Sequence, residues 1–326
     1  MTTTPHPEID ECITVRTQGF DLAARVTRPR EAPVAVIVLW SAMGVKASHY
    51  DAFGAELAAS GFGVVTVDLR GQGDSLPVPR RGHAYGYEDV ATQDWPRVIA
   101  AARETFGPDL PLYVLGHSLG GQMSLLHLAR HPESVDGMVL VASGSVHYRC
   151  YSGLARLKVL LGPMLIALIS AVLGYWPGDR LGFGGRQSAR LVRDWARTAR
   201  TGRWRPAGAG VDYESLLPGV RIPVLAISVE GDDLAPPSAV DGLCRKLPSA
   251  RVERWHTALP ARGGSPHFRW VRDAEGIALR IREWFDAGRP GAAVEEGRAE
   301  LAGGDAGTPP DEGRAGTADG DGRVAG

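Results

Sequence analysis

The sequence has almost no excess of charge of either sign. Its 326 residues include 36 Lys and Arg and 37 Asp and Glu, so the formal net charge is −1 at pH 7. A protein that binds nucleic acid usually concentrates basic residues, and this overall balance predicts no such partner. Only three of the basic residues are lysines, and Ala, Arg and Gly are abundant. We attribute this composition to the base composition of the genome rather than to function.

Cysteine is scarce as well. Cys12, Cys150 and Cys244 are far apart and form no CxxC pair, so the sequence indicates neither a disulfide framework nor a zinc site. The chain also lacks a P-loop, a dinucleotide-binding fingerprint and a cluster of metal-ligating residues. We therefore expect no cofactor and no bound metal.

The sequence shows no signal peptide and one run long enough to suggest a membrane span. The first residues, MTTTPHPEIDE, contain neither a basic region nor an apolar core, so a cytoplasmic protein is the default expectation. The apolar run at 159–176 has about the minimum length for spanning. Gly162-Pro163 interrupts the run, Ser170 and Gly174 dilute it, and basic residues flank both ends. We therefore predict a pair of helices packed over a substrate site, with no membrane span.

Apolar runs and helical patterns alternate along most of the chain, which is typical of βαβ units. The predicted fold is therefore α/β, with a mostly parallel sheet and helices on both faces. We expect strands, from the apolar runs and from one shorter hairpin, at 12–16, 20–26, 34–40, 63–68, 112–116, 136–142, 222–229 and 251–255. We expect amphipathic helices at 50–60, 89–106, 122–130, 238–247 and 274–285.

The alternation breaks between residues 145 and 218. That stretch contains the apolar run, an amphipathic helix at 191–197, and Gly/Arg-rich loops expected at 178–186 and 202–210. We predict a helical cap at 145–218, inserted into a core made of 12–144 and 219–286. Residues 1–11 are expected to be a flexible N-terminus. Residues 287–326, which have almost no large apolar side chains, are expected to be a disordered tail.

The most specific motif is the sequence LYVLGHSLGG at 112–121. An apolar run there leads into G-x-S-x-G and a helical pattern follows, which is the strand–turn–helix context of a nucleophile elbow. The serine of such an elbow adopts positive φ, and Gly116 and Gly120 avoid the clashes that a Cβ would cause. We predict that Ser118 is a catalytic nucleophile, against the alternative of a merely flexible glycine loop.

A serine nucleophile needs a base that takes its proton. With this elbow the chain order is Ser, then Asp or Glu, then His, so the base should follow the last strand. His256 and His267 come late enough. His256 lies at the end of the strand expected at 251–255, whereas His267 lies in the turn-rich sequence GGSPHF before the last helix. We predict His267 as the base, and expect the side chain of His117 to point away across the elbow.

The acid that orients the base should follow the strand at 222–229. Asp232 and Asp233 are adjacent there, and alternation would aim only one of them inward. We prefer Asp232, with Asp233 as the alternative and Glu230 as a third possibility. The carboxylate that is not used would be an ordinary turn residue.

An oxyanion hole would need two backbone N–H groups. The N–H of Leu119 follows the nucleophile, and the second donor should follow the third strand, where we choose Met43. The side chain of Met43 could also line an acyl pocket. The motif DLRGQGDS at 68–75 is interpreted as structural, with glycines for a tight loop that Asp68 and Arg70 hold in place.

From about Cys12 to Phe285 the chain resembles the α/β-hydrolase superfamily. Within it, the chain is similar to the serine-aminopeptidase/monoacylglycerol-lipase-like group and to a poorly characterised bacterial subgroup. The resemblance implies an eight-stranded sheet, a helical cap and a Ser118–Asp232–His267 triad. Many members carry His-Gly where this chain has Ser41-Ala42. The resemblance rests on GHSLGG at 116–121, DLRGQGDS at 68–75, Asp232-x-x-x-Pro236 and Pro266-His267-Phe268, and for the subgroup on AMGV at 42–45, GYWPG at 174–178, LG at 181–182 and RDWAR at 193–197.

The sequence therefore predicts a serine hydrolase that cleaves a carboxylic ester through an acyl-enzyme on Ser118. Its partner would be a small-molecule acyl substrate, either lipid-like or another small hydrophobic ester. Two alternatives stay open: an acyltransferase with the same acyl-enzyme, and a non-catalytic binding protein of hydrolase fold. An epoxide or haloalkane hydrolase is disfavoured, because those enzymes place Asp at the elbow. The apolar cap residues expected to favour a hydrophobic acyl group are Leu160, Leu161, Met164, Leu165, Leu168 and Val172.

Overall fold

The computed structural model describes residues 10–260 and 263–288. The described residues up to Trp284 belong to one compact unit, and residues 285–288 belong to a second. Glu11 of the predicted flexible N-terminus begins the strand Glu11–Thr17, and residues 287 and 288 of the predicted tail end the helix Ala274–Gly288. The other residues of both segments, except residue 10, lie outside the described residues.

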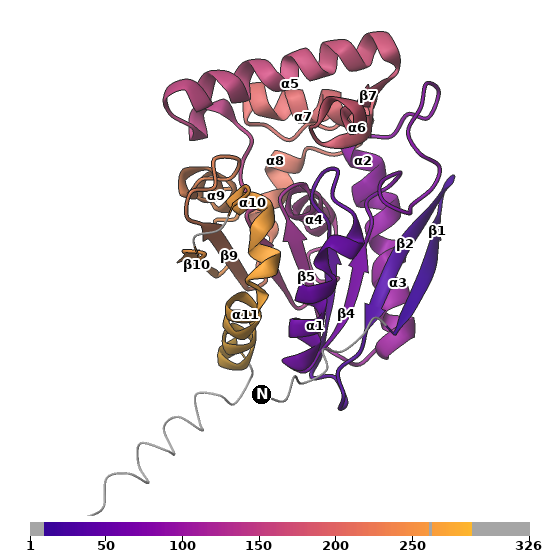
Figure 1. Ribbon diagram of the computed structural model, residues 1–326, viewed down its shortest axis with the longest axis vertical. Helices are drawn as coiled ribbons and strands as arrows, with labels where there is room; N and C mark the ends of the chain where they lie inside the picture. The colour runs from indigo at the N-terminus through magenta and orange to yellow at the C-terminus, as the bar shows by residue number, and fades with distance from the viewer. Residues whose placement is uncertain (1–9, 261–262, 289–326) are drawn as a thin grey trace, which may run out of the picture. The chain divides into compact units, whose positions relative to one another are not determined.

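An eight-stranded sheet lies at the centre of the first unit (Figure 1). Its strand order is β1-β2-β4-β3-β5-β6-β9-β10. β1 pairs antiparallel with β2 and β2 antiparallel with β4, and all other neighbours are parallel. This confirms the predicted α/β fold. The strands are β1 (Glu11–Thr17), β2 (Phe20–Thr27), β3 (Ala35–Trp40), β4 (Phe62–Val67), β5 (Leu112–His117), β6 (Gly137–Val141), β9 (Val224–Val229) and β10 (Val252–Thr257).

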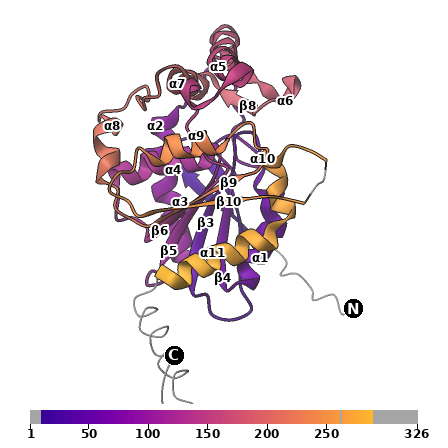
Figure 2. The ribbon, with the colours of Figure 1, turned by 90° about the vertical axis from the view of Figure 1, so that its left-hand side faces the viewer.

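Helices cover both faces of the sheet (Figure 2). On one face, α1 (Asp51–Ala59) lies beside α11 (Ala274–Gly288), and the guanidinium of Arg282 donates to the carbonyl of Ser60 at 2.6 Å. On the other face, α3 (Trp95–Phe106) packs against α4 (Leu119–Arg130). Every residue of β3, β4, β6 and β9 is buried, because apolar helix faces cover these strands from both sides.

The helix expected at 89–106 forms in three parts. They are α2 (Tyr87–Asp89), a π-helical turn at Val90–Asp94, and α3. Pro96 lies in the first turn of α3, where a missing N–H costs no intrahelical hydrogen bond. The later helix expected at 238–247 is α9 (Pro237–Cys244).

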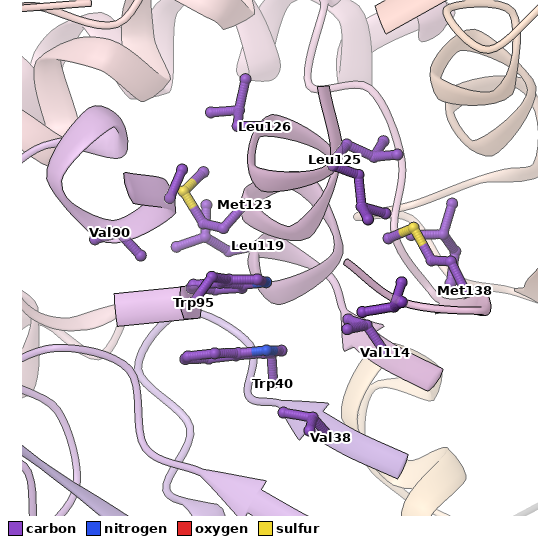
Figure 3. Packing of buried hydrophobic residues seen from close by; sticks show 14 of the residues in the cluster. Val38, Trp40, Val90, Trp95, Val114, Leu119, Met123, Leu125, Leu126 and Met138 are labelled. Carbon is purple, nitrogen blue, oxygen red and sulfur yellow. The ribbon is translucent and has the colours of Figure 1, made fainter. Parts of the chain in front are cut away.

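Two tryptophans connect the central strand to the helices of one face (Figure 3). Trp40, the last residue of β3, stacks on Trp95, the first of α3, with ring centroids 3.3 Å apart and planes 4° apart. The indole N–H of Trp95 donates to the hydroxyl of Ser124 on α4 at 3.0 Å. Leu119 and Met123 of α4 lie over this pair. The end of β3 and the start of α4 are therefore held against the same rigid rings.

The segment between β6 and β9 differs from the prediction. The apolar run forms one helix, α5 (Gly153–Leu173), rather than a pair, and Pro163 lies inside it. The prediction treated Gly162-Pro163 as a break because proline removes a helical hydrogen bond. Pro163 is buried, however, and packing of this helix face maintains a single helix across it.

The loop expected at 178–186 is also partly ordered. It contains α6 (Gly178–Leu181) and the start of β8 (Gly185–Ser188), which pairs antiparallel with β7 (Tyr175–Pro177). Gly184 has a φ of +70°, and a Cβ on Gly44 would lie 2.3 Å from the carbonyl carbon of Gly184. The glycines that suggested a loop are needed for this close backbone contact. The segment continues with α7 (Ala189–Thr201), where a helix was expected, and α8 (Tyr213–Leu216).

We expect Trp95→Ala to lower the free energy of unfolding by about 3–5 kcal/mol, because it removes a buried ring and leaves a cavity beneath Trp40. Urea denaturation followed by circular dichroism measures this. The control is Leu279→Ala on α11, where the side chain is 56% exposed and the change should stay below about 0.5 kcal/mol. Equal losses in the two variants would contradict the packing described here.

Candidate active site

Ser118 sits at a strained turn between β5 and α4. Its φ of +52° lies in a region that L-residues rarely adopt. A Cβ on Gly116 would lie 2.2 Å from the Cα of Gly121, and a Cβ on Gly120 would lie 2.4 Å from the carbonyl oxygen of Trp40. The two glycines are therefore required by the close approach of α4 to the strand ends, as the motif predicted.

His267 and Asp232 come together with Ser118. The Nε2 of His267 lies 3.0 Å from the Oγ of Ser118, and its Nδ1 lies 2.8 Å from Oδ2 of Asp232. His267 belongs to α10 (Pro266–Arg269), and Asp232 follows β9. Both side chains are buried. The three groups form one continuous line of hydrogen bonds, in the order expected for nucleophile, base and acid.

Asp232 is fixed from two sides. Its Oδ1 accepts the N–H groups of Leu234 at 2.9 Å and Ala235 at 3.0 Å, which leaves Oδ2 for His267. Asp233 is exposed, and it is Asp232 that pairs with His267. The geometry thus favours Asp232 over the alternative acid. Glu230, the third possibility, is likewise exposed.

His256 lies apart from this arrangement. It is exposed on β10, and its Nδ1 lies 2.9 Å from the Oγ of Ser228. It does not line the cavity described below. The position agrees with its interpretation as a surface residue of the strand.

A second buried network was missed by the sequence reasoning. The N–H of Ala42 donates to the hydroxyl of Tyr50 at 2.9 Å, and that hydroxyl lies 2.7 Å from Nδ1 of His117. The indole N–H of Trp270 donates to Nε2 of His117 at 3.3 Å. The network connects the end of β3 to the segment that follows His267. No local pattern indicates such a contact, because its members are up to 228 positions apart.

His117 is held neutral in this network. Burial, and next the positive charge that His267 would carry, hold the pKa of His117 well below its usual range. Burial also raises the pKa of Tyr50. His117 adjoins Ser118 in sequence but does not line the cavity, in agreement with the expectation that its side chain points away.

A cavity of about 410 Å³ opens above Ser118 and His267. Met43 and Leu119, the residues predicted to supply the oxyanion N–H groups, both line it. Leu119 is the first residue of α4, so its N–H has no acceptor within the helix. The N–H of Gly44 donates to Oε1 of Gln72, which fixes the turn that carries Met43.

The α5 residues that line the cavity are not the residues predicted from the sequence. Of the six cap residues expected at the substrate, none lines the cavity, and Leu161, Met164, Leu165, Leu168 and Val172 are exposed. Apolar composition alone could not tell which face of a uniformly apolar helix points inward. The α5 residues that line the cavity are Lys158, Val159, Gly162, Pro163 and Ile166, and the further apolar lining includes Val146, Tyr151, Phe183, Trp195, Leu234 and Phe268.

The loop at 68–75 is structural, as interpreted. Asp68 accepts the N–H groups of Ala47 at 2.6 Å and Asp74 at 2.9 Å. Arg70 forms a buried ion pair with Asp94. None of these groups lines the cavity. Within the described residues, no group of three or more His, Cys, Asp or Glu side chains is placed to hold a metal ion.

Known proteins resemble this chain in sequence and in fold. Residues 31–174 match the family described as serine aminopeptidase, S33. Lysophospholipase L2 of Escherichia coli K12 is 36% identical over 88 residues, which is 25% of this chain and 24% of that protein. Monoglyceride lipase of Mus musculus is 29% identical over 130 residues, which is 39% of this chain and 41% of that protein. The matched regions thus span less than half the length of these curated relatives.

The fold is shared over a greater length. The structure of Est1E from Butyrivibrio proteoclasticus with bound ferulic acid superposes with a TM-score of 0.59 at 15% identity, covering 84% of this chain and 97% of that one. The fold and the elbow define an α/β-hydrolase. The chain shares the α/β-hydrolase fold, and residues 31–174 resemble the S33 serine aminopeptidase family.

Asp232→Asn should reduce the turnover of an ester such as p-nitrophenyl butyrate by about 10³–10⁴-fold, because the amide can no longer hold the imidazole in the tautomer that accepts the serine proton. Asp233→Asn is the matched control and should change the rate by about twofold or less. A large loss in Asp233→Asn with a small one in Asp232→Asn would reverse the assignment of the acid.

Proposed function

We propose that the protein is a serine hydrolase that cleaves carboxylic esters with an apolar acyl group. The observation that carries this proposal is the line of hydrogen bonds Ser118–His267–Asp232 at the floor of a largely apolar cavity. The names of the relatives, a lysophospholipase and a monoglyceride lipase, support ester hydrolysis as the class of reaction.

The reaction would begin with transfer of the Ser118 proton to Nε2 of His267 as Oγ attacks the ester carbonyl. Asp232 stabilises the imidazolium that forms and keeps the ring oriented. The negative oxygen of the tetrahedral intermediate would accept hydrogen bonds from the N–H groups of Leu119 and Met43. As the intermediate collapses, the C–O bond breaks and His267 gives its proton to the departing alcohol.

The second half of the reaction would release the acid. A water molecule gives a proton to Nε2 of His267 and attacks the acyl carbon bound to Ser118. Collapse of the second intermediate returns the proton to Ser118 and frees the carboxylic acid. Because Ser118, His267 and Asp232 already lie within hydrogen-bond distance of one another, these three side chains would need no rearrangement before attack.

The cavity supports an apolar acyl group as the substrate class. Val159 and Ile166 from α5, with Phe183 and Leu234 from loops nearby, enclose the space above Ser118. Burial of an acyl chain against these side chains contributes roughly 0.8 kcal/mol for each methylene group. The rate constant kcat/KM should therefore rise with acyl length until the chain fills the cavity.

A fluorophosphonate probe should label wild-type protein at Ser118, because the probe reacts with a serine whose proton an adjacent base accepts. Intact and peptide mass spectrometry locate the label. Ser118→Ala and His267→Ala should abolish labelling, whereas His256→Ala should not. A folded wild-type protein that stays unlabelled would favour a non-catalytic binding protein, and transfer of the acyl group to added alcohol in place of water would indicate an acyltransferase.

Ile166→Trp should lower kcat/KM for a decanoate ester at least tenfold more than for an acetate ester, because the larger ring fills the part of the cavity that a long chain would occupy. A p-nitrophenyl ester series measures this. Leu168→Trp, two residues further along α5 and 64% exposed, is the matched control and should leave the ratio unchanged. An unchanged ratio in Ile166→Trp would mean that the acyl chain binds elsewhere.

A further inference from the structure

The outward side of α5 is an apolar surface that the described part of the chain leaves exposed. We call it the outer stripe, and it consists of Leu154, Leu157, Leu161, Leu165, Leu168 and Val172, with Met164 beside it. The members recur every three or four residues, so they share one side of the helix. Leu154 is 77% exposed and Val172 is 67% exposed. A soluble monomer seldom leaves so long a row of large apolar side chains in water.

The helix that carries the outer stripe lies outermost in the first unit. In both ribbon views α5 forms the layer farthest from the sheet, with α7 beneath it (Figures 1 and 2). Its other side faces inward: Pro163 and Ser170 are buried, and Val159 and Ile166 line the cavity. One helix therefore carries part of the cavity lining on one side and the outer stripe on the other.

The length of α5 would also suit a membrane span. It is the one helix in the described ranges 10–260 and 263–288 that is long and apolar enough to cross a bilayer. A spanning helix would have to leave α7 and expose the cavity that it covers. Pro163 and Ser170, on the inward side, pack into the fold. The helix is suited instead to lie flat, with only the outer stripe in contact with an apolar medium.

The segment around α5 is strongly basic although the whole chain is not. Residues 145–210 contain ten arginines and one lysine against two aspartates and no glutamate. Asp179 is paired with Arg186, and Asp194 is buried, where it accepts N–H groups of the backbone. Arg190 is paired with Asp89 from outside the segment, and the eleven basic side chains of residues 145–210 still greatly outnumber its two acids. The overall net charge of −1 conceals this concentration of cations in one part of the molecule.

Basic residues gather at the start of α5. The guanidinium groups of Arg149 and Arg156 lie 5.7 and 5.2 Å from the ring centre of Tyr148. Partial burial, and then the positive charges of Arg149, Lys246 and Arg156, lower the pKa of His147. A Cβ on Gly202 would lie 2.7 Å from this histidine, so the end of α7 lies beside the same cluster. The end of α7 and the loop after it add Arg197, Arg200, Arg203 and Arg205, which surround one shallow hollow.

The other end of α5 is basic as well. The guanidinium of Arg81 donates to the carbonyl of Val172 at 2.6 Å, which brings the loop at 76–84 to the end of the helix. Arg80 is exposed in the same loop, and Arg180 is exposed on α6. Within the described residues, no carboxylate forms an ion pair with Arg80, Arg81 or Arg180.

We propose that the outer stripe of α5 docks on the surface of an anionic lipid bilayer, with the helix parallel to that surface. Apolar side chains would enter the boundary between headgroups and acyl chains, and the arginines at both ends of α5 would contact lipid phosphates. The charge pattern favours a bilayer over a second copy of this chain. Two outer stripes packed together would place arginines of one copy opposite arginines of the other.

Docking would also bring the candidate active site close to the bilayer. Val159 and Ile166 line the cavity from the same helix that carries the outer stripe, so an acyl lipid in the bilayer would be a nearby substrate. The supply of substrate from the bilayer rests on the proposed function, whereas the docking of the outer stripe does not. An experiment can therefore contradict one of these claims and leave the other intact.

The test is flotation of the full chain with vesicles of phosphatidylcholine alone and of phosphatidylcholine with 30% phosphatidylglycerol. We expect binding at least tenfold tighter to the anionic vesicles at low salt, and a loss of that preference at about 0.5 M NaCl. The double variant Leu161→Glu/Leu168→Glu should bind at least tenfold more weakly. Leu279→Glu on α11, also an exposed leucine, should bind like wild type.

Fluorophosphonate labelling of the same samples shows whether the site is still folded. A double variant that is labelled but no longer floats supports the proposal. If the double variant loses both labelling and flotation, the single variants Leu161→Glu and Leu168→Glu take its place. A labelled single variant should bind the anionic vesicles more weakly than wild type, and equal binding by both single variants overturns the proposal. Flotation of Ser118→Ala should match wild type, which separates docking from catalysis. The proposal is overturned if wild type floats with neither vesicle, or if the double variant floats equally well. Light scattering could instead show that wild type is a dimer and that the double variant is a monomer. That result would assign the outer stripe to contact with a second copy of the chain and overturn the proposal.

Discussion

The contact between α4 and the end of β3 is the constraint on which the site depends. Gly120 lies so close to the carbonyl of Trp40 that even a Cβ would not fit. This approach gives Ser118 its positive φ and directs its hydroxyl out of the sheet. The stacked rings of Trp40 and Trp95 hold the same two segments from the other side. The strained backbone at Ser118 is thus maintained by the rigid, buried residues packed around it rather than by the turn itself.

The parts of the site come from distant stretches of chain that the sheet aligns. Ser118 follows β5 and Asp232 follows β9, and both strands end at the same edge because they are parallel to β6 between them. His267 comes from α10, and the network of Ala42, Tyr50 and His117 connects that region to β3. The catalytic geometry proposed here is therefore a property of the whole sheet.

Much of this could be predicted from sequence because it depends on local patterns. Buried parallel strands appear as continuous apolar runs, and an elbow requires glycines at fixed spacing around Ser118. What could not be predicted depends on contacts over long distances. Pro163 was interpreted as a helix break, since a sequence does not show the packing that retains the helix across it. The inward side of α5 was assigned to the wrong residues, because an almost uniformly apolar helix carries no periodic signal.

The two sides of α5 have a consequence for how related proteins can diverge. Residues that line the cavity and residues of the outer stripe alternate along one helix, yet no side chain belongs to both sets. A change at Ile166 alters the space above Ser118 and leaves the outer surface as it was, while a change at Leu168 does the reverse. Substrate range and surface chemistry can thus evolve independently within a single 21-residue helix.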